Sequence, residues 1–391
     1  MVTRATTGLR RAGMLTMLAA LMLPVSSVPP AAMADDAITR QDYADAFHLK
    51  DLHDKGYTGK GVTIAYIEAS PDMSVPELQG ANIETRSPCD MSFVPEGHAH
   101  STTVASILAN KDWGWAPEAT IINYTAPTVD DKLAYPNMCD GKLPSIEDQI
   151  NRALNDGADI ISISMADSGR DKIGAPAFTR AALLGVPIVA GSDNTGNEAY
   201  SSSIGLANTV AAVGSTNLQG TRSEFSSYGD YLTIMAPGEG ITMRQADDSG
   251  KLTSINKQGQ GTSLSTPMVA GLLALGKQRW PKATGNQLLR SLIDTATNDG
   301  KGWTPEYGWG LISPAKFLNN DPTSLEDTNP LWNKRPGAKP DQQSVADYKD
   351  GLADPSELTT DDTYVYRGVD ETLVRSYPDK SEFGTSPRYR K

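Results

Sequence analysis

Short, continuous runs of apolar and β-branched residues recur along the chain and are separated by helical patterns. They are VTIAYI (62–67), ATIINY (119–124), ADIISISM (158–165), VPIVAGS (186–192) and TVAAVG (209–214). A strand with one exposed face alternates apolar with polar residues, whereas these runs are apolar nearly throughout, as strands covered on both faces should be. The sequence therefore predicts an α/β fold, in which a mostly parallel sheet carries helices on both faces.

Helical patterns fill the intervals between these runs. SIEDQINRALNDG (145–157) begins with Ser145 and Asp148, which are spaced as a capping box. STPMVAGLLALGKQRW (265–280) is apolar nearly all round, so we expect this helix to run through the core. The other predicted helices are HSTTVASILAN (100–110), PAFTRAALLG (176–185) and NQLLRSLIDTAT (286–297).

The first 34 residues have the three parts of a secretory signal peptide. Three arginines come first, an apolar run follows from Met14 to Val25, and AAMA ends at Ala34 before two aspartates. A membrane anchor is the alternative, but the apolar run is short for a bilayer core of about 30 Å. No second such run follows, so we expect the mature chain to have no membrane span and to be secreted, extracellular or in the cell envelope.

Charge and cysteine content limit the partners and the compartment. The net charge of the 391 residues is −12, and the first 34 contain no acid, so nucleic acid is not expected as a partner. Cys89 and Cys139 are the only cysteines. In an oxidising compartment an even count favours a disulfide between them, and two separate buried thiols are the alternative. No oligomeric state is predicted.

Composition also divides the chain into segments. Residues 35–57 form a polar, partly helical N-terminal extension, and residues 58–320 contain all the predicted strands and the helices between and after them. This central segment is long enough for one large domain. Residues 321–391 are rich in Asp, Ser, Thr, Pro and Lys. We predict an extended or partly disordered tail there, with wrapping over the domain surface as the alternative.

The strongest local signal for chemistry is GQGTSLSTPMVAG (259–271). Small residues around Ser263 permit a tight turn that exposes the hydroxyl, and the following helix directs its positive N-terminus and free N–H groups toward it. We expect Pro267 in the first helical turn, where a missing backbone donor costs little. Because a Gly-Thr-Ser turn alone is more commonly an ordinary helix cap, other segments must decide its role.

This segment resembles the nucleophile motif of the subtilisin-like serine proteases, in which Gly-Thr-Ser is followed by Pro and then by Val-Ala-Gly. The resemblance extends over residues 56–318, through GYTGKGVTIAYIE, HSTTVAS, GADIISISM, VPIVAGSDN, FSSYGDYLTIMAPG and YGWGLISPAKF. The order acid, histidine, serine along the chain is also that of the subtilisins. The resemblance implies a subtilisin-like three-layer fold and a serine endopeptidase that acts on a protein or peptide without a cofactor.

The resemblance assigns four residues to catalysis. Ser263 is the nucleophile, and His100 is the base that takes its proton and later gives it to the leaving amine. Glu68 stands where the family has the Asp that orients the imidazole. Asn194 donates its side-chain amide to the oxyanion together with the backbone N–H of Ser263. Asn197 is the rival for the place of Asn194.

The resemblance also implies the walls of a substrate cleft at the ends of two predicted strands. These residues are Ser164, Met165, Ala166, Ala190, Gly191 and Ser192. The stretch from His100 to Pro117 is shorter than in subtilisins, so the loop that supplies calcium ligands there is trimmed. We therefore expect no metal at that position.

Glu68 is the main departure from the family pattern. One extra methylene moves the carboxylate by roughly 1 Å or more unless the end of the strand retreats, and a misplacement of that size can cost about 10²-fold in rate. Asp72 is a possible substitute acid. The spacing of Glu68 and Asp72 is also similar to that of the carboxylate pair of the sedolisins, but that pair lies on a helix and works without the histidine that is present here as His100.

Further departures lie close to the same residues. Ser101 replaces the family's Gly after the base, Thr103 replaces its second His, and Asp193, which we expect to point to solvent, replaces the Gly before the oxyanion Asn. His98 is interpreted as a surface residue. These departures define a second hypothesis, a weakened or inactive subtilisin-like protein that binds peptides or a partner. The intact serine motif, base and oxyanion residue favour the active enzyme.

Overall fold

A computed structural model describes residues 37–141, 143–165, 176–198, 204–247 and 249–332. The predicted signal peptide, Ala166 and the chain from residue 333 onward lie outside the described residues. Within these ranges seven strands form one parallel sheet in the order β2-β3-β1-β4-β5-β6-β7, which confirms the predicted α/β class. The strands are β1 (Thr63–Glu68), β2 (Ile83–Arg86), β3 (Thr120–Thr125), β4 (Ile160–Ile163), β5 (Ile188–Gly191), β6 (Val210–Thr216) and β7 (Leu232–Pro237), with a separate antiparallel hairpin of β8 (Ile241–Ala246) and β9 (Leu252–Gly259).

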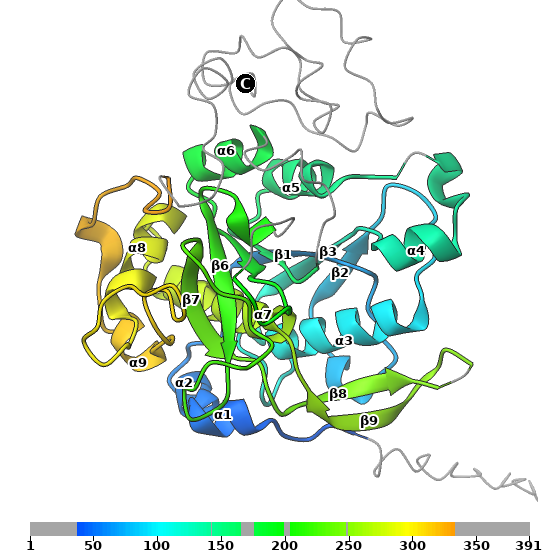
Figure 1. The fold of residues 1–391 in the computed structure, drawn as a ribbon, viewed down its shortest axis with the longest axis horizontal. Coiled ribbons are helices and arrows are strands. Elements are labelled where there is room, and N and C mark those ends of the chain that lie inside the picture. The colour runs from blue at the N-terminus through cyan, green and yellow to red at the C-terminus, as the bar shows by residue number, and fades with distance from the viewer. Residues whose placement is uncertain (1–36, 142, 166–175, 199–203, 248, 333–391) are drawn as a thin grey trace, which may run out of the picture. The chain divides into compact units, whose positions relative to one another are not determined.

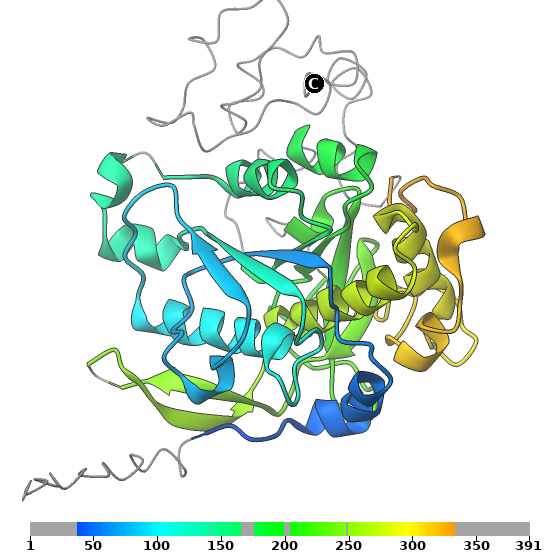
Figure 2. The same cartoon turned by 180° about the vertical axis from the view of Figure 1, so that it is seen from behind.

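Helices cover both faces of the sheet (Figure 1), and Figure 2 shows the same layers from behind. One core cluster joins the sheet to α3, α7 and α8, and a second joins it to α5 and α6. No helix in the ranges given above is long and apolar enough to cross a membrane. The helices are α1 (Asp42–Ala46), α2 (Leu49–Asp54), α3 (Pro95–Ala109), α4 (Val129–Ala134), α5 (Ile146–Asn155), α6 (Pro176–Leu183), α7 (Thr262–Arg279), α8 (Gly285–Thr295) and α9 (Pro314–Phe317).

The two cores explain why the strands are apolar nearly throughout. Ile64 and Tyr66 of β1 lie in the cluster that contains α3 and α7, whereas Ala65 and Ile67 lie in the cluster that contains α5. Successive side chains of a strand point to opposite faces, so a strand covered on both faces buries all of them. A polar residue within such a strand would lose its contact with water on either face.

The two helices that carry the predicted base and nucleophile begin earlier than the sequence indicates. α3 begins at Pro95, whose fixed φ suits the first helical position, so His100 lies in the second turn and not at the start. α7 begins at Thr262, which places Ser263 in the first turn and Pro267 in the second. The expectation of Pro267 in the first turn is therefore wrong. Because proline has no N–H, the carbonyl four residues earlier, that of Ser263, does not receive the usual helical hydrogen bond from residue 267.

Both ends of the described chain pack against this domain. Tyr43 of α1 and Leu49 of α2 are buried in the same core as α3. Leu331 is 7% exposed, and its carbonyl accepts the N–H of Thr209 at 3.0 Å. The last described residues thus belong to the packed structure, although the sequence places the start of the polar tail at residue 321.

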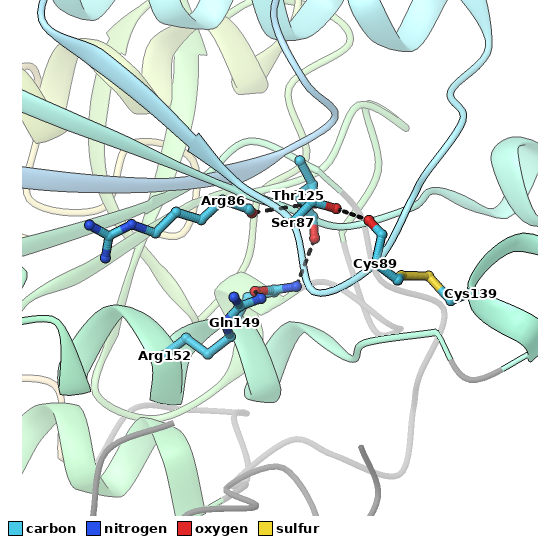
Figure 3. Close-up of a disulfide and its surroundings, with 7 residues drawn as sticks. All are labelled: Arg86, Ser87, Cys89, Thr125, Cys139, Gln149 and Arg152. Carbon is cyan, nitrogen blue, oxygen red and sulfur yellow. Dashed lines mark hydrogen bonds between the residues drawn. A yellow bond between two sulfur atoms is a disulfide. The ribbon is translucent and has the colours of Figure 1, made fainter. Parts of the chain in front are cut away.

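A disulfide joins Cys89 and Cys139, which are 50 residues apart in the sequence, as predicted (Figure 3). Cys89 follows β2, where the hydroxyl of Ser87 donates to its carbonyl at 2.5 Å. Thr125 at the end of β3 donates to the carbonyl of Arg86 at 3.4 Å. Cys139 lies in the short 3₁₀ helix Met138–Gly141, which follows α4. The disulfide therefore connects the segment after β2 to the segment after α4.

Candidate active site

The end of β1 lies at the point where the order of the strands reverses. β2 and β3 lie on one side of β1, and β4 to β7 follow on the other. In open parallel sheets, ligands bind outside the carboxyl ends of the strands at this switch point. Glu68 is the last residue of β1 and is 2% exposed. The topology therefore places one buried acid at the position where a binding cleft is expected.

His100 on α3 bridges this acid and the serine of α7. Its Nδ1 lies 3.3 Å from Oε2 of Glu68, and its Nε2 lies 2.8 Å from Oγ of Ser263. In a neutral imidazole one nitrogen donates and the other accepts. The contact with Glu68 has an ion-pair distance but falls short of hydrogen-bond geometry at Oε2. In the tautomer whose proton is on Nδ1, the nitrogen nearer to the carboxylate, Nε2 is free to accept the proton of the serine hydroxyl. The structure thus brings together three of the residues that the resemblance selected.

The acid also sets the basicity of the imidazole. Burial acts to lower the pKa of His100, but the negative charge of Glu68 and hydrogen bonding to it act in the opposite direction and prevail. The pKa of His100 is therefore raised above its ordinary value of 6.5. A base with a raised pKa removes a proton more readily, provided that the pH is high enough to keep it neutral.

Two glycines leave room for the serine hydroxyl. A Cβ on Gly261, whose φ is +155°, would lie 3.0 Å from Oγ of Ser263. A Cβ on Gly191, at the end of β5, would lie 2.9 Å from Oγ1 of Thr262. Both distances are shorter than nearly all real Cβ contacts, and the φ of Gly261 is one that residues with a side chain rarely adopt, so glycine at these positions favours the close approach of the turn before α7 to the sheet.

Asn194 is oriented by the same turn. Its Oδ1 accepts the backbone N–H of Thr262 at 2.9 Å. Its Nδ2 lies near the nucleophile, since a Cβ on Gly261 would be 3.7 Å from Nδ2 and 3.0 Å from Oγ of Ser263. The amide of Asn197 instead donates to the carbonyl of Thr195 at 3.1 Å in an exposed loop. Of the two asparagines, Asn194 is the one that contacts the segment of Ser263.

The predicted cleft walls lie at the ends of adjacent strands. Ile163 of β4 pairs with Ala190 of β5, so the residues that follow each strand lie next to each other. Ala190, Ser164 and Ser192 are buried, and Met165 and Gly191 are half-buried. Ala166 lies outside the described residues.

Comparison with known proteins places this geometry in a family. The model of the subtilase family matches residues 59–310, which is more than half of the chain. The chain belongs to the subtilase family. Subtilisin BL of Lederbergia lenta is 30% identical over 270 residues, which cover 67% of this chain and 92% of that protein. Subtilisin E of Bacillus subtilis (strain 168) is 29% identical over 270 residues, which cover 67% of each protein.

Solved structures agree on the fold. The crystal structure of MycP1 from the ESX-1 type VII secretion system matches with a TM-score of 0.57 and 24% identity, over 74% of this chain and 87% of that one. At this identity the likeness concerns the fold alone. It confirms the predicted subtilisin-like three-layer architecture of this subtilase.

The acids next to the site in this subtilase have partners of their own. Oδ1 of Asp72 accepts from the N–H and the hydroxyl of Ser74, at 2.8 and 2.6 Å. Oδ1 of Asp193 accepts the N–H of Asn194 at 2.7 Å in an exposed position. Asp193 has a φ of +91°, a conformation that favours glycine, which is the residue that the family pattern places there. The described contacts of Asp72 therefore do not include His100.

Several supporting residues were missed in the sequence. Thr262 holds Asn194, and the hydroxyl of Tyr231 donates to the carbonyl of Ser192 at 2.7 Å. His98, interpreted as a surface residue, is half-buried, and its Nδ1 donates to the carbonyl of Ser70 at 2.8 Å. These contacts join residues that are distant along the chain, so no local sequence pattern predicts them.

Glu68→Gln should lower the pKa of His100. A carboxylate favours the charged imidazole, so removal of its charge weakens proton binding, and the pH below which the base is protonated moves down. The measurement is the chemical shift of the imidazole protons by NMR as a function of pH. Asp72→Asn is the control and should leave the titration unchanged. An equal decrease in both variants would identify Asp72 as a second partner and contradict the assignment.

Proposed function

We propose that this subtilase is a secreted serine endopeptidase that hydrolyses peptide bonds through an acyl-enzyme on Ser263. The observation that carries the proposal is the 2.8 Å contact between Nε2 of His100 and Oγ of Ser263, with the carboxylate of Glu68 3.3 Å behind the imidazole. A serine hydroxyl is a weak nucleophile unless a neighbouring base accepts its proton. The arrangement provides that base and an anion that stabilises its charged form.

The reaction then proceeds in two halves. Oγ of Ser263 attacks the substrate carbonyl while Nε2 of His100 takes its proton, and a tetrahedral oxyanion forms. Nδ2 of Asn194 and the N–H of Ser263 donate to this oxyanion. The carbon–nitrogen bond breaks as His100 protonates the leaving amine. Water, deprotonated by His100, next attacks the acyl-enzyme, releases the acid product and restores the serine.

The length of Glu68 alters this scheme only in degree. Its 3.3 Å distance to His100 exceeds the 2.7–2.9 Å typical of charge-assisted hydrogen bonds. Coulomb attraction declines only in inverse proportion to distance, so a buried carboxylate at this separation still stabilises an imidazolium. The site therefore keeps the electrostatic role of the acid, while the contact at Oε2 falls short of a directional hydrogen bond.

Secretion has separate support. The N-terminal 34 residues have the pattern of a signal peptide, and the two cysteines form a disulfide, which persists in oxidising compartments. A secreted location also suits an enzyme whose substrates are proteins or peptides.

The test of the proposed function is labelling of the purified protein with a fluorophosphonate probe, which reacts with activated serines. The wild type should be labelled at one serine, whereas Ser263→Ala should abolish labelling and His100→Ala should slow it by about 10³-fold or more. Peptide mapping identifies the labelled residue. Wild-type labelling no greater than that of Ser263→Ala would contradict the active enzyme and favour the peptide-binding hypothesis.

Glu68→Asp should reduce kcat and should not restore it. The shorter side chain withdraws the carboxylate by roughly 1 Å from an imidazole that is already distant, which should cost about 10-fold to 10²-fold. Steady-state hydrolysis of a fluorogenic peptide measures the change, with Glu84→Asp on the exposed face of β2 as the control. A rise in kcat would show that Glu68 is merely too long and that the site has not adapted to it.

Asn194→Ala should lower kcat by about 10² to 10³ while it leaves KM nearly unchanged, because the lost donor acts on the transition state. Asn197→Ala is the matched control from the same loop and should stay within about twofold of the wild type in kcat. Both constants come from the same peptide assay. Equal losses in the two variants would mean that the loop, and not the amide of Asn194, is responsible.

A further inference from the structure

The backbone carbonyl of Ala69, the residue after Glu68, is held from two sides. The hydroxyl of Ser101 on α3 donates to it, and Nδ2 of Asn123 on β3 donates to it at 3.3 Å. The N–H of Ala69 in turn donates to Oε1 of Glu68 at 3.3 Å. A single residue therefore connects two donors from neighbouring elements to the carboxylate that faces His100.

We propose that Ser101 and Asn123 are positioning residues, which fix the place of the Glu68 carboxylate relative to His100 through Ala69. The inference rests on the proposed function, since it concerns the same acid and base. It assigns a task to two polar side chains that do not touch the reacting atoms.

Burial makes these contacts effective. Ser101, Asn123 and Ala69 are 0% exposed, and Glu68 is 2% exposed. In such a dry environment a hydrogen bond is stronger than in water, and a polar group that loses its partner finds no replacement. Loss of the Ser101 hydroxyl therefore leaves the Ala69 carbonyl with weaker support and allows the end of β1 to shift.

The helix that carries the base also holds the chain that carries the acid. His98, Ser101 and Thr102 are spaced to share one face of α3. His98 donates to the carbonyl of Ser70, and the hydroxyl of Thr102 accepts a backbone N–H of the same segment, both at 2.8 Å. The contact of Ser101 is the one nearest to the acid. The helix that carries the base thus contributes directly to the position of the segment that follows the acid, together with Asn123 of β3.

A glutamate needs this support more than an aspartate does. The glutamate side chain has one more rotatable bond, so its carboxylate can occupy more positions and loses more conformational entropy when it is fixed in one of them. Ser101 and Glu68 are both larger than the Gly and Asp of the family pattern, and the two substitutions meet at Ala69. We interpret Ser101 as the change that accommodates the longer acid.

The test is a double-mutant cycle between Ser101→Ala and Glu68→Ala, read by the rate constant of fluorophosphonate labelling. Ser101→Ala alone should slow labelling by about 10-fold, since a displacement below 1 Å costs less than the 10²-fold of a full ångström. In the Glu68→Ala background the same change should have no further effect. Ser106→Ala is the matched control, because this buried hydroxyl of α3 donates within its own helix, to the carbonyl of Thr102.

An equal loss in both backgrounds, or no loss in either, overturns the positioning role. Ser101→Gly should behave like Ser101→Ala, because both remove the hydroxyl but leave side chains of different size. Asn123→Ala should likewise slow labelling only when Glu68 is present. A merely structural role would slow labelling equally with and without the acid.

A second readout keeps the proposal testable if the wild type is not labelled at all, an outcome that contradicts the proposed function. In NMR titrations, Ser101→Ala should lower the pKa of His100 toward its value in Glu68→Ala, and Ser106→Ala should leave it unchanged. This shift requires no turnover. An unchanged pKa in Ser101→Ala overturns the inference whether or not the protein is a peptidase.

Discussion

The site depends on the packing of α3 against α7 on one face of the parallel sheet. The two helices contact each other, and their buried faces share one core with the sheet. This contact brings His100 and Ser263, which are 163 residues apart in the sequence, to 2.8 Å. Gly261 before α7 and Gly191 at the end of β5 leave room for the turn that carries Ser263 to approach the sheet, so the position of the reactive pair results from core packing.

The same packing places the carboxylate of Glu68 in the protein interior, where an ionised group is unfavourable. Glu68 is 2% exposed, and burial of an ionised acid is unfavourable unless charges and donors compensate. The N–H of Ala69 donates to Oε1, and His100 lies at ion-pair distance from Oε2 and compensates its charge when the imidazole is protonated. The acid and the base therefore stabilise each other, and removal of either leaves the other in an environment unsuited to it. This mutual dependence links the stability of the site to its chemistry.

The sequence predicted much of the fold, and it selected three candidate site residues that the structure brings together. Continuous apolar runs are a strong signal, and five of the seven sheet strands follow from them. The other two sheet strands were not predicted. β2 contains exposed polar residues and resembles a loop, whereas β7, although buried along its whole length, was assigned only to the family segment FSSYGDYLTIMAPG. The motif selected Ser263 and His100, but Thr262 and Asn123 act through hydrogen bonds to residues 68 and 54 positions away, which no local pattern encodes.

The central claim is that Glu68, although longer than the family's acid, orients the base of a working serine peptidase. A crystal structure of the protein after reaction with a fluorophosphonate tests it most directly. The account predicts a phosphonyl group on Ser263, a carboxylate oxygen of Glu68 still beside Nδ1 of His100, and the phosphonyl oxygen about 3 Å from Nδ2 of Asn194. An adduct on another residue, or a Glu68 side chain turned away from His100 in the adduct, would contradict it.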